Sequence, residues 1–154
     1  MKSMSISALF SPATSNRPAL TSVGRIVLDT PGFLAFCPFA SRFPFETWIL
    51  PRVHHSSFEV MGYEMRRQLA DVLKETLTRI NGALSSPPYN FIVHAAPSGE
   101  TDLKYYHWHV EIMLKLTKIS GFEWGSGFYI NPVPPEEAAS YLREVVLERQ
   151  EVEA

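Results

Sequence analysis

The chain of 154 residues contains a single cysteine, Cys37, which lies in an apolar run between Phe36 and Pro38. One cysteine cannot form a disulfide within the chain, so the sequence fits a reducing compartment and we expect a cytoplasmic protein. Its apolar neighbours predict that Cys37 is a small buried hydrophobic residue rather than a reactive thiol.

Long apolar runs and clusters of positive charge are also missing. No apolar run approaches the roughly 20 residues that a membrane-spanning helix needs. The formal net charge is −2 and the lysines and arginines are dispersed, which argues against a nucleic-acid or membrane partner. We therefore expect a soluble protein that holds any phosphate-bearing partner at a local site.

Acidic residues are absent from the first 28 residues, which are rich in serine. Organelle transit peptides share this composition, but the segment has no clear amphipathic periodicity and contains two prolines. We predict that residues 1–23 form a disordered tail and that residues 24–154 form one domain. The hydrophobic share of 45% is ample for the core of such a domain.

Periodicity predicts an α+β fold, an antiparallel sheet of about five strands with two main helices. The first two strands, 24–29 and 33–37, form a hairpin around Thr30-Pro31-Gly32, and a third strand covers 46–50. Ser56 and Glu59 have the spacing of a capping box and predict the opening of a helical region. Beyond Gly62, apolar residues at steps of three and four form one stripe of a helix that ends near Ser85.

The second half of the chain is predicted to supply the other strands and a C-terminal helix. A fourth strand covers 89–95 and a fifth covers 105–113, joined by a loop short enough for antiparallel pairing. Residues 117–131 are aromatic and punctuated by glycines, so we expect turns there. Pro135, followed by two glutamates, suits the first turn of the last helix.

The fifth strand carries the polar pattern on which the functional interpretation depends. Alternation places His107, His109 and Glu111 on one face of the sheet, and His94 of the fourth strand faces the same way. Three imidazoles on adjacent strands can share one zinc-sized ion, and Glu111 can be a fourth ligand or the acceptor that fixes a histidine tautomer. Hydrogen-bonded histidines on a half-buried sheet face are an equally good interpretation.

Two other groups of residues have alternative uses. His109 can act as a nucleophile toward a phosphoryl centre, but this use and metal binding compete for the same lone pair. Near the glycine-rich segment, Phe122, Glu123, Trp124 and Asn131 can stack on and hydrogen-bond a sugar, although a turn between strands explains the glycines as well.

Four separated motifs follow one another along the chain, at residues 42–52 (RFPFETWILPR), 89–94 (YNFIVH), 107–109 (HWH) and 121–132 (GFEWGSGFYINP). They resemble the C-terminal half of the galactose-1-phosphate uridylyltransferases and related sugar-phosphate nucleotidyltransferases, members of the histidine-triad superfamily. The similarity covers about residues 24–147. It implies an antiparallel, histidine-triad-like half-barrel.

The resemblance also implies roles for individual residues. His94, His107 and His109 match the histidines of a structural iron or zinc site, whose fourth ligand is a carboxylate from the other repeat, and Glu111 is a candidate substitute. Gly121, Phe122 and Glu123 match a segment that contacts the hexose phosphate of a neighbouring active site. The nucleophile of the family lies in a His-Pro-His motif of the N-terminal repeat, and no such motif occurs in this chain.

Three functional hypotheses follow. The leading one is a C-terminal-type transferase domain that binds a divalent metal, zinc or iron, and a sugar phosphate or nucleotide sugar. The second is a single-repeat histidine-triad nucleotide hydrolase or phosphorylase with His109 as its nucleophile. The third is a non-catalytic subunit. We expect either a homodimer or association with a separate protein that supplies the N-terminal half.

Overall fold

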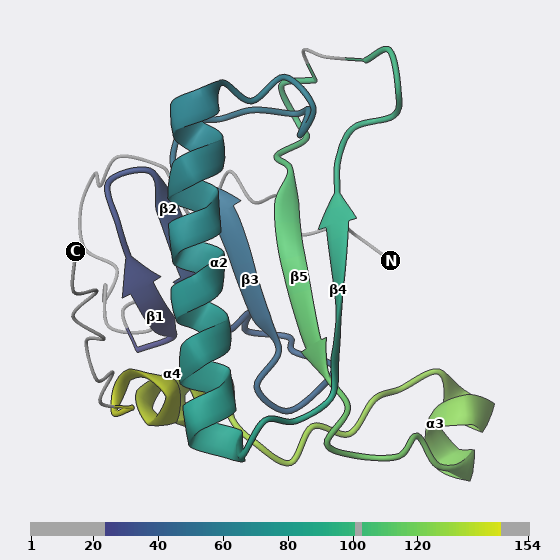
Figure 1. Cartoon of the computed structure of the whole chain (residues 1–154). Coiled ribbons are helices and arrows are strands. Elements are labelled where there is room, and N and C mark those ends of the chain that lie inside the picture. Colours follow the sequence, from purple (N-terminus) through teal and green to yellow (C-terminus); the bar gives the residue numbers. More distant parts are fainter. Residues whose placement is uncertain (1–23, 101–102, 146–154) are drawn as a thin grey trace, which may run out of the picture.

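The computed structural model of the chain describes residues 24–100 and 103–145. Its centre is an antiparallel sheet of five strands in the order β1-β2-β3-β5-β4 (Figure 1). The strands are β1 (Ile26–Asp29), β2 (Phe33–Phe36), β3 (Thr47–Pro51), β4 (Tyr89–His94) and β5 (His109–Leu114). The predicted α+β class, the hairpin of β1 and β2, and the antiparallel pairing of β4 with β5 are confirmed.

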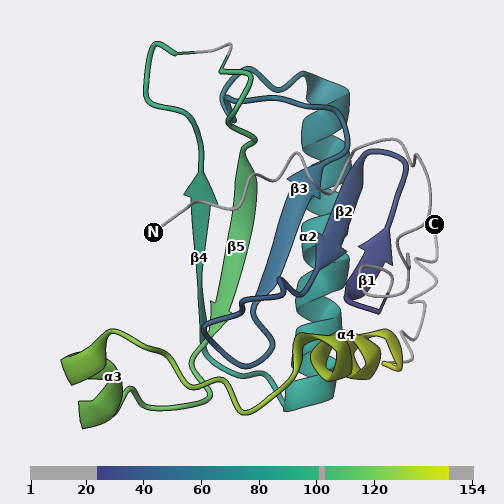
Figure 2. The ribbon, with the colours of Figure 1, turned by 180° about the vertical axis from the view of Figure 1, so that it is seen from behind.

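Three helices complete the described part of the chain. Helix α2 (Tyr63–Leu84) lies along one face of the sheet, and α4 (Pro135–Arg143) lies beside the lower ends of α2 and β1 (Figures 1 and 2). Helix α3 (Gly121–Ser126) stands away from the sheet, within a long connection between β5 and α4. We call residues 115–134, which form this connection, the arm.

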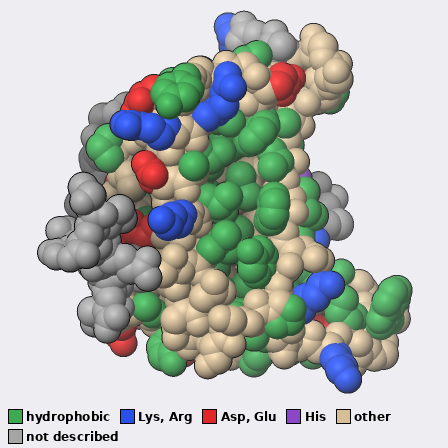
Figure 3. Space-filling model, viewed as in Figure 1, with side chains coloured by type: hydrophobic (Ala, Val, Ile, Leu, Met, Phe, Trp, Pro, Cys, Tyr) green, Lys and Arg blue, Asp and Glu red, His purple; other side chains and the backbone are tan. Residues whose placement is uncertain are grey.

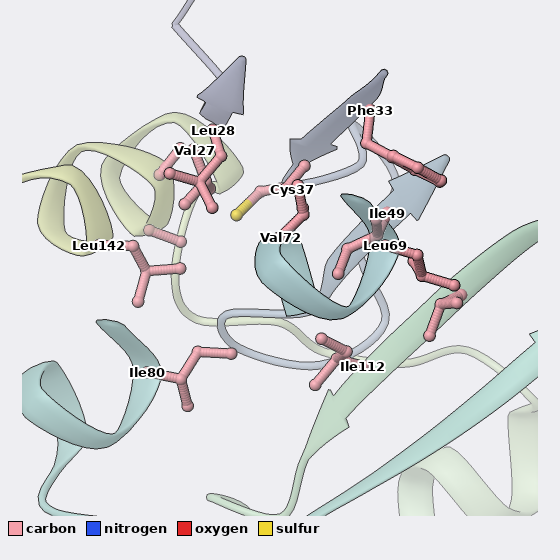
Figure 4. Close-up of a cluster of buried hydrophobic side chains, with 14 of the residues drawn as sticks. Val27, Leu28, Phe33, Cys37, Ile49, Leu69, Val72, Ile80, Ile112 and Leu142 are labelled. Atoms are coloured by element: carbon pink, nitrogen blue, oxygen red, sulfur yellow. The ribbon is translucent and has the colours of Figure 1, made fainter. Parts of the chain in front are cut away.

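The core lies between the sheet and α2. The predicted apolar stripe of α2 is confirmed, because Leu69, Val72 and Ile80 are buried against side chains from the strands and from α4, as Figure 4 shows. On the sheet side, Ile49 of β3 and Ile112 of β5 are fully buried. Removing this apolar surface from water is the main favourable term in folding.

Two local predictions are wrong. Ser56 and Glu59 do not open a helix, since α2 begins at Tyr63 with Gly62 as its N-cap. The Ser56 hydroxyl instead accepts a hydrogen bond from the backbone N–H of Leu103 at 3.2 Å, which ties two loops together. Glycine-rich residues 121–126, expected as a turn, form α3, whose capping box joins Ser120 and Glu123.

The fifth strand is shorter than predicted, because β5 begins at His109 rather than at Tyr105. The predicted disordered tail, residues 1–23, lies outside the described residues. Within the described ranges, no helix combines the length and the apolar character that crossing a bilayer requires.

Candidate metal site

Two histidines and a glutamate converge where β4 ends and β5 begins. His94 is the last residue of β4 and lies directly opposite His109, the first residue of β5. Glu111 follows two residues later, so alternation places it on the same face as His109. The potential ligand atoms of these three residues all lie within 4.8 Å of one another. The antiparallel register of β4 and β5 therefore brings together three of the four residues that the sequence pattern places on one face.

Both carboxylate oxygens of Glu111 are engaged. Nε2 of His94 donates a hydrogen bond to Oε2 at 2.9 Å, and Nη2 of Arg42 donates to Oε1 at 2.8 Å. The Glu111 side chain is almost fully buried, whereas about half of the Arg42 side chain is exposed. A buried carboxylate is costly unless it is paired, and these two donors compensate its charge.

The imidazole of His109 is held between two other rings. The indole of Trp48 stacks on one side, with ring centroids 4.5 Å apart, and His94 stacks on the other at 4.8 Å. Nδ1 of His109 lies 3.2 Å from the carbonyl of His107. A carbonyl only accepts, so Nδ1 carries the proton and Nε2 presents its lone pair. Burial lowers the pKa of His109, which favours this neutral form.

His107 occupies a different environment from the other two histidines. Its ring packs edge-on against His54, with centroids 5.1 Å apart, and it contributes no atom to the group of His94, His109 and Glu111. Burial, followed by the neighbouring His54, lowers the pKa of His107 to about 4. His107, which the resemblance implies as a metal ligand, thus lies near the group of His94, His109 and Glu111 but is not a member of it.

The donor set of His94, His109 and Glu111 fits a divalent transition metal. Neutral imidazole and carboxylate are common zinc ligands, and two histidines with one carboxylate also suit iron(II). Two ligands of one zinc ion are at most about 4.2 Å apart, since each bond is 2.0–2.1 Å long. Small side-chain rotations would thus bring atoms that lie within 4.8 Å of one another onto a common ion.

The predicted sugar-binding residues lie on the arm. Phe122 is exposed, as is its neighbour Trp124. The carboxylate of Glu123 accepts hydrogen bonds from the backbone N–H groups of Ser120, at 2.8 Å, and Ile130, at 3.3 Å, and these bonds lower its pKa. In this chain Glu123 therefore shapes the arm, while the ring of Phe122 is exposed.

Asn131 connects the arm to the body of the domain. Its side-chain amide donates to the carbonyls of Ser41, at 3.3 Å, and Phe43, at 3.2 Å, and its Oδ1 accepts from the N–H of Val133. The arm is thereby fixed to the loop between β2 and β3, residues 37–46, which also carries Arg42.

Sequence reasoning did not single out Arg42, Glu46 or Trp48 as functional residues, although all three surround the site. The available signal was their position in the motif of residues 42–52, which carries part of the family resemblance.

The fold is that of a histidine-triad-like domain. A zinc-bound histidine triad family protein from Mycobacterium smegmatis superposes with a TM-score of 0.56 over 77% of this chain and 80% of that chain. Its sequence is only 16% identical, so the likeness is one of fold alone.

The sequence identifies the family. Residues 11–150 match the model of the galactose-1-phosphate uridyl transferase C-terminal domain, and the chain belongs to this family. This match does not favour the second hypothesis, a single-repeat histidine-triad nucleotide hydrolase or phosphorylase. The leading interpretation, a C-terminal domain of the uridylyltransferase type, is confirmed.

The relatives include two kinds of enzyme. The chain is 40% identical to ADP-glucose phosphorylase from Arabidopsis thaliana, over 79% of this chain and 35% of that protein. A crystal structure of an Arabidopsis ADP-glucose phosphorylase with bound ADP-glucose superposes with a TM-score of 0.76 over 79% of this chain and 40% of that one. Identity to the galactose-1-phosphate uridylyltransferase of Thermotoga maritima is 36%, over 80% of this chain and 42% of that protein. The chain thus spans about two fifths of the length of these relatives.

Proposed function

We propose that this chain is the metal-holding and sugar-binding half of a nucleotidyltransferase-type enzyme that acts on a sugar phosphate or nucleotide sugar. The observation that carries the proposal is the convergence of His94, His109 and Glu111 across β4 and β5. A divalent ion, zinc or iron, would be held by His94 and His109, with Glu111 as a ligand or as the acceptor that fixes the His94 tautomer. His107 belongs to the proposed set because the family resemblance implies it.

The proposed ion has a structural role. It would join β4 to β5 at the end of the sheet where their hydrogen-bonded pairing begins, and it would stabilise the folded domain by its binding free energy. Phe122, with Glu123 and Asn131 shaping the arm around it, would contact the sugar.

Metal analysis combined with chelation tests this proposal. Purified protein is expected to contain about one zinc or iron per chain, and chelation is expected to lower its thermal midpoint. His94→Asn and His109→Asn should each remove the metal, and His107→Asn asks whether the ligand implied by the resemblance is used. His55→Asn is the control, since His55 lies outside the group. A metal-free preparation whose thermal stability is unaffected by chelation would sink the proposal.

The exposed strand β4 supports a proposed partner. Among the described strands β4 pairs with β5 alone, so its outer edge has no neighbour. Alternation places Phe91 and Val93 on the face shared with α2, and both are exposed. Hydrophobic side chains gather on this face of the molecule (Figure 3). Exposed apolar edge strands pair readily with other chains. We propose that β4 continues its sheet with a second copy or with a separate protein that supplies the N-terminal half.

Light scattering after size-exclusion chromatography distinguishes these partners. A dimer of the wild-type chain that becomes a monomer in Phe91→Lys indicates a second copy. A monomer that co-purifies with a protein containing His-Pro-His indicates a separate half. Ile119→Lys is the control for added charge on an exposed apolar side chain, because Ile119 lies on the arm. A monomer with neither partner contradicts the proposal.

Cys37 supports a proposed compartment. Burial raises the pKa of this thiol to about 12, so the side chain behaves as the inert hydrophobic residue that the sequence predicts. A buried, unpaired thiol is compatible with the reducing cytoplasm, where we propose that the protein resides. Fractionation of cells that express the full chain tests this location.

A further inference from the structure

Glu46 is a buried carboxylate in the loop that leads into β3, and only 2% of its surface is exposed. Its Oε2 accepts hydrogen bonds from the backbone N–H groups of Arg42, at 2.8 Å, and Phe43, at 3.2 Å. Its Oε1 accepts from Nε1 of Trp48 at 3.0 Å. Three donors on one buried acceptor fix both the loop backbone and the indole ring.

Both groups that Glu46 holds lead directly to the candidate metal site. The Trp48 ring stacks on the His109 imidazole with an angle of 20° between the ring planes. Arg42 donates to Oε1 of Glu111, and Oε2 of the same carboxylate accepts from His94. The Glu46 carboxylate is thus hydrogen-bonded to two residues, Trp48 and Arg42, which contact His109 and Glu111 respectively.

The opposite side of the same loop is fixed by the arm. Asn131 holds the carbonyls of Ser41 and Phe43, and Tyr129 packs edge-on against Phe43 with ring centroids 5.5 Å apart. The arm and Glu46 therefore hold the loop from two directions. Of these anchors, Glu46 is the one that also bonds to Trp48.

We propose that Glu46 is a positioning residue of the metal site. Through Trp48 it sets the plane of the His109 imidazole, and through Arg42 it sets the direction of the Glu111 carboxylate. The consequence for metal affinity rests on the proposed metal function. The geometric consequence, an altered environment of His109, belongs to the metal-free protein and does not depend on it.

Glu46→Gln tests this role with almost no change of volume. An amide has one accepting oxygen and one donating NH₂ group, so it cannot accept from the loop backbone and from the indole at once. If its oxygen keeps the two backbone bonds, its NH₂ faces Nε1 of Trp48, donor against donor, and the indole must move. We expect the NMR signals of the His109 ring protons to shift in metal-free Glu46→Gln, because ring currents from Trp48 act on them.

Metal affinity provides the second measurement. Loss of partners that orient metal ligands typically weakens metal binding by 10- to 100-fold, so we expect the zinc dissociation constant of Glu46→Gln to rise by about 10-fold or more. Competition with a chromophoric chelator measures this constant. Ser41→Ala is the matched control, since it removes a hydrogen bond to Pro38 within the same loop and touches neither Trp48 nor Glu111. Its His109 signals and zinc affinity should equal those of the wild type.

The outcomes separate the two proposals. Folded Glu46→Gln with unchanged His109 signals overturns the positioning role, whatever its stability. Wild-type protein that binds no zinc removes the proposed metal function, while the NMR comparison still decides the role of Glu46. If Glu46→Gln does not fold, Trp48→Phe replaces it, because it keeps an aromatic ring but deletes the donor to Glu46. Because the exchange of rings itself shifts the His109 signals, zinc affinity is the measurement for Trp48→Phe, and a dissociation constant equal to that of the wild type would overturn the proposal.

Discussion

Strands β4 and β5 are hydrogen-bonded along their whole length, yet they bury very different amounts of side chain. Five of the six residues of β5 are buried, and none of the six residues of β4 is. Phe91 and Ile112 lie opposite each other, but Phe91 is 56% exposed and Ile112 is fully buried. The difference arises because β5 lies inside the sheet and β4 at its edge, beyond the cover of α2 (Figure 1). β5 therefore stabilises the domain, while β4 leaves most of its side chains exposed.

The largest expected effect comes from truncating this opposed pair. Ile112→Ala should lower the free energy of unfolding by about 2–5 kcal/mol, because it leaves a cavity in a packed core. Phe91→Ala should change it by no more than about 0.5 kcal/mol, since an exposed ring loses few contacts. Denaturant unfolding at a protein concentration at which the chain is monomeric measures both values.

A large loss of stability in dilute Phe91→Ala would mean that another part of the chain covers β4. The comparison between the two strands would then fail for the isolated chain. The difference between the two variants, rather than either value alone, is the quantity to compare.

Acidification should act on His107, a buried residue two positions before β5. The pKa of His107 is about 4 in the folded protein and about 6.5 when unfolded, so the unfolded chain binds more protons between these values. The stability of the metal-free protein is thus fully present above pH 6.5 and falls as the pH drops towards 4, by up to about 3 kcal/mol. Denaturant unfolding at several pH values, with chelator present, measures the slope.

His107→Asn isolates this contribution from those of other groups. Glu46, whose pKa burial raises, acts in the opposite direction over part of the same range. Subtracting the pH profile of the variant from that of the wild type cancels Glu46 and leaves the term from His107. Parallel profiles for the two proteins would show that His107 is not held neutral by burial.

Much of the fold was predictable because its signals are local. Thr30-Pro31-Gly32 between two apolar runs predicts the hairpin, and the steps of three and four along α2 predict its buried stripe. The errors have a non-local cause. Ser56 and Glu59 satisfy a local capping pattern, but the Ser56 hydroxyl bonds to Leu103, which is 47 residues away.

The site was predictable where it depends on one pair of consecutive strands. Alternation and a short loop bring His94, His109 and Glu111 together. His107 differs because β5 begins at His109, so strand alternation does not extend back to it. Trp48 was missed because its contact requires β3 to lie beside β5, and a helix and a strand separate these two in sequence. The spacing of apolar residues along the chain does not show which distant strands lie side by side in the sheet.

The smallest expected difference tests the two strands with one identical substitution. Val93 of β4 pairs with Val110 of β5, and 37% of Val93 but only 3% of Val110 is exposed. Val110→Thr should cost about 1–3 kcal/mol, because it buries a hydroxyl in an apolar core, whereas Val93→Thr should cost less than about 0.5 kcal/mol. Both residues favour strands, so propensity cancels. Denaturant unfolding at several protein concentrations measures both losses of unfolding free energy. If a second copy covers β4, the loss caused by Val93→Thr should grow as the protein concentration rises. A loss that stays the same although the chain associates would place the interface elsewhere.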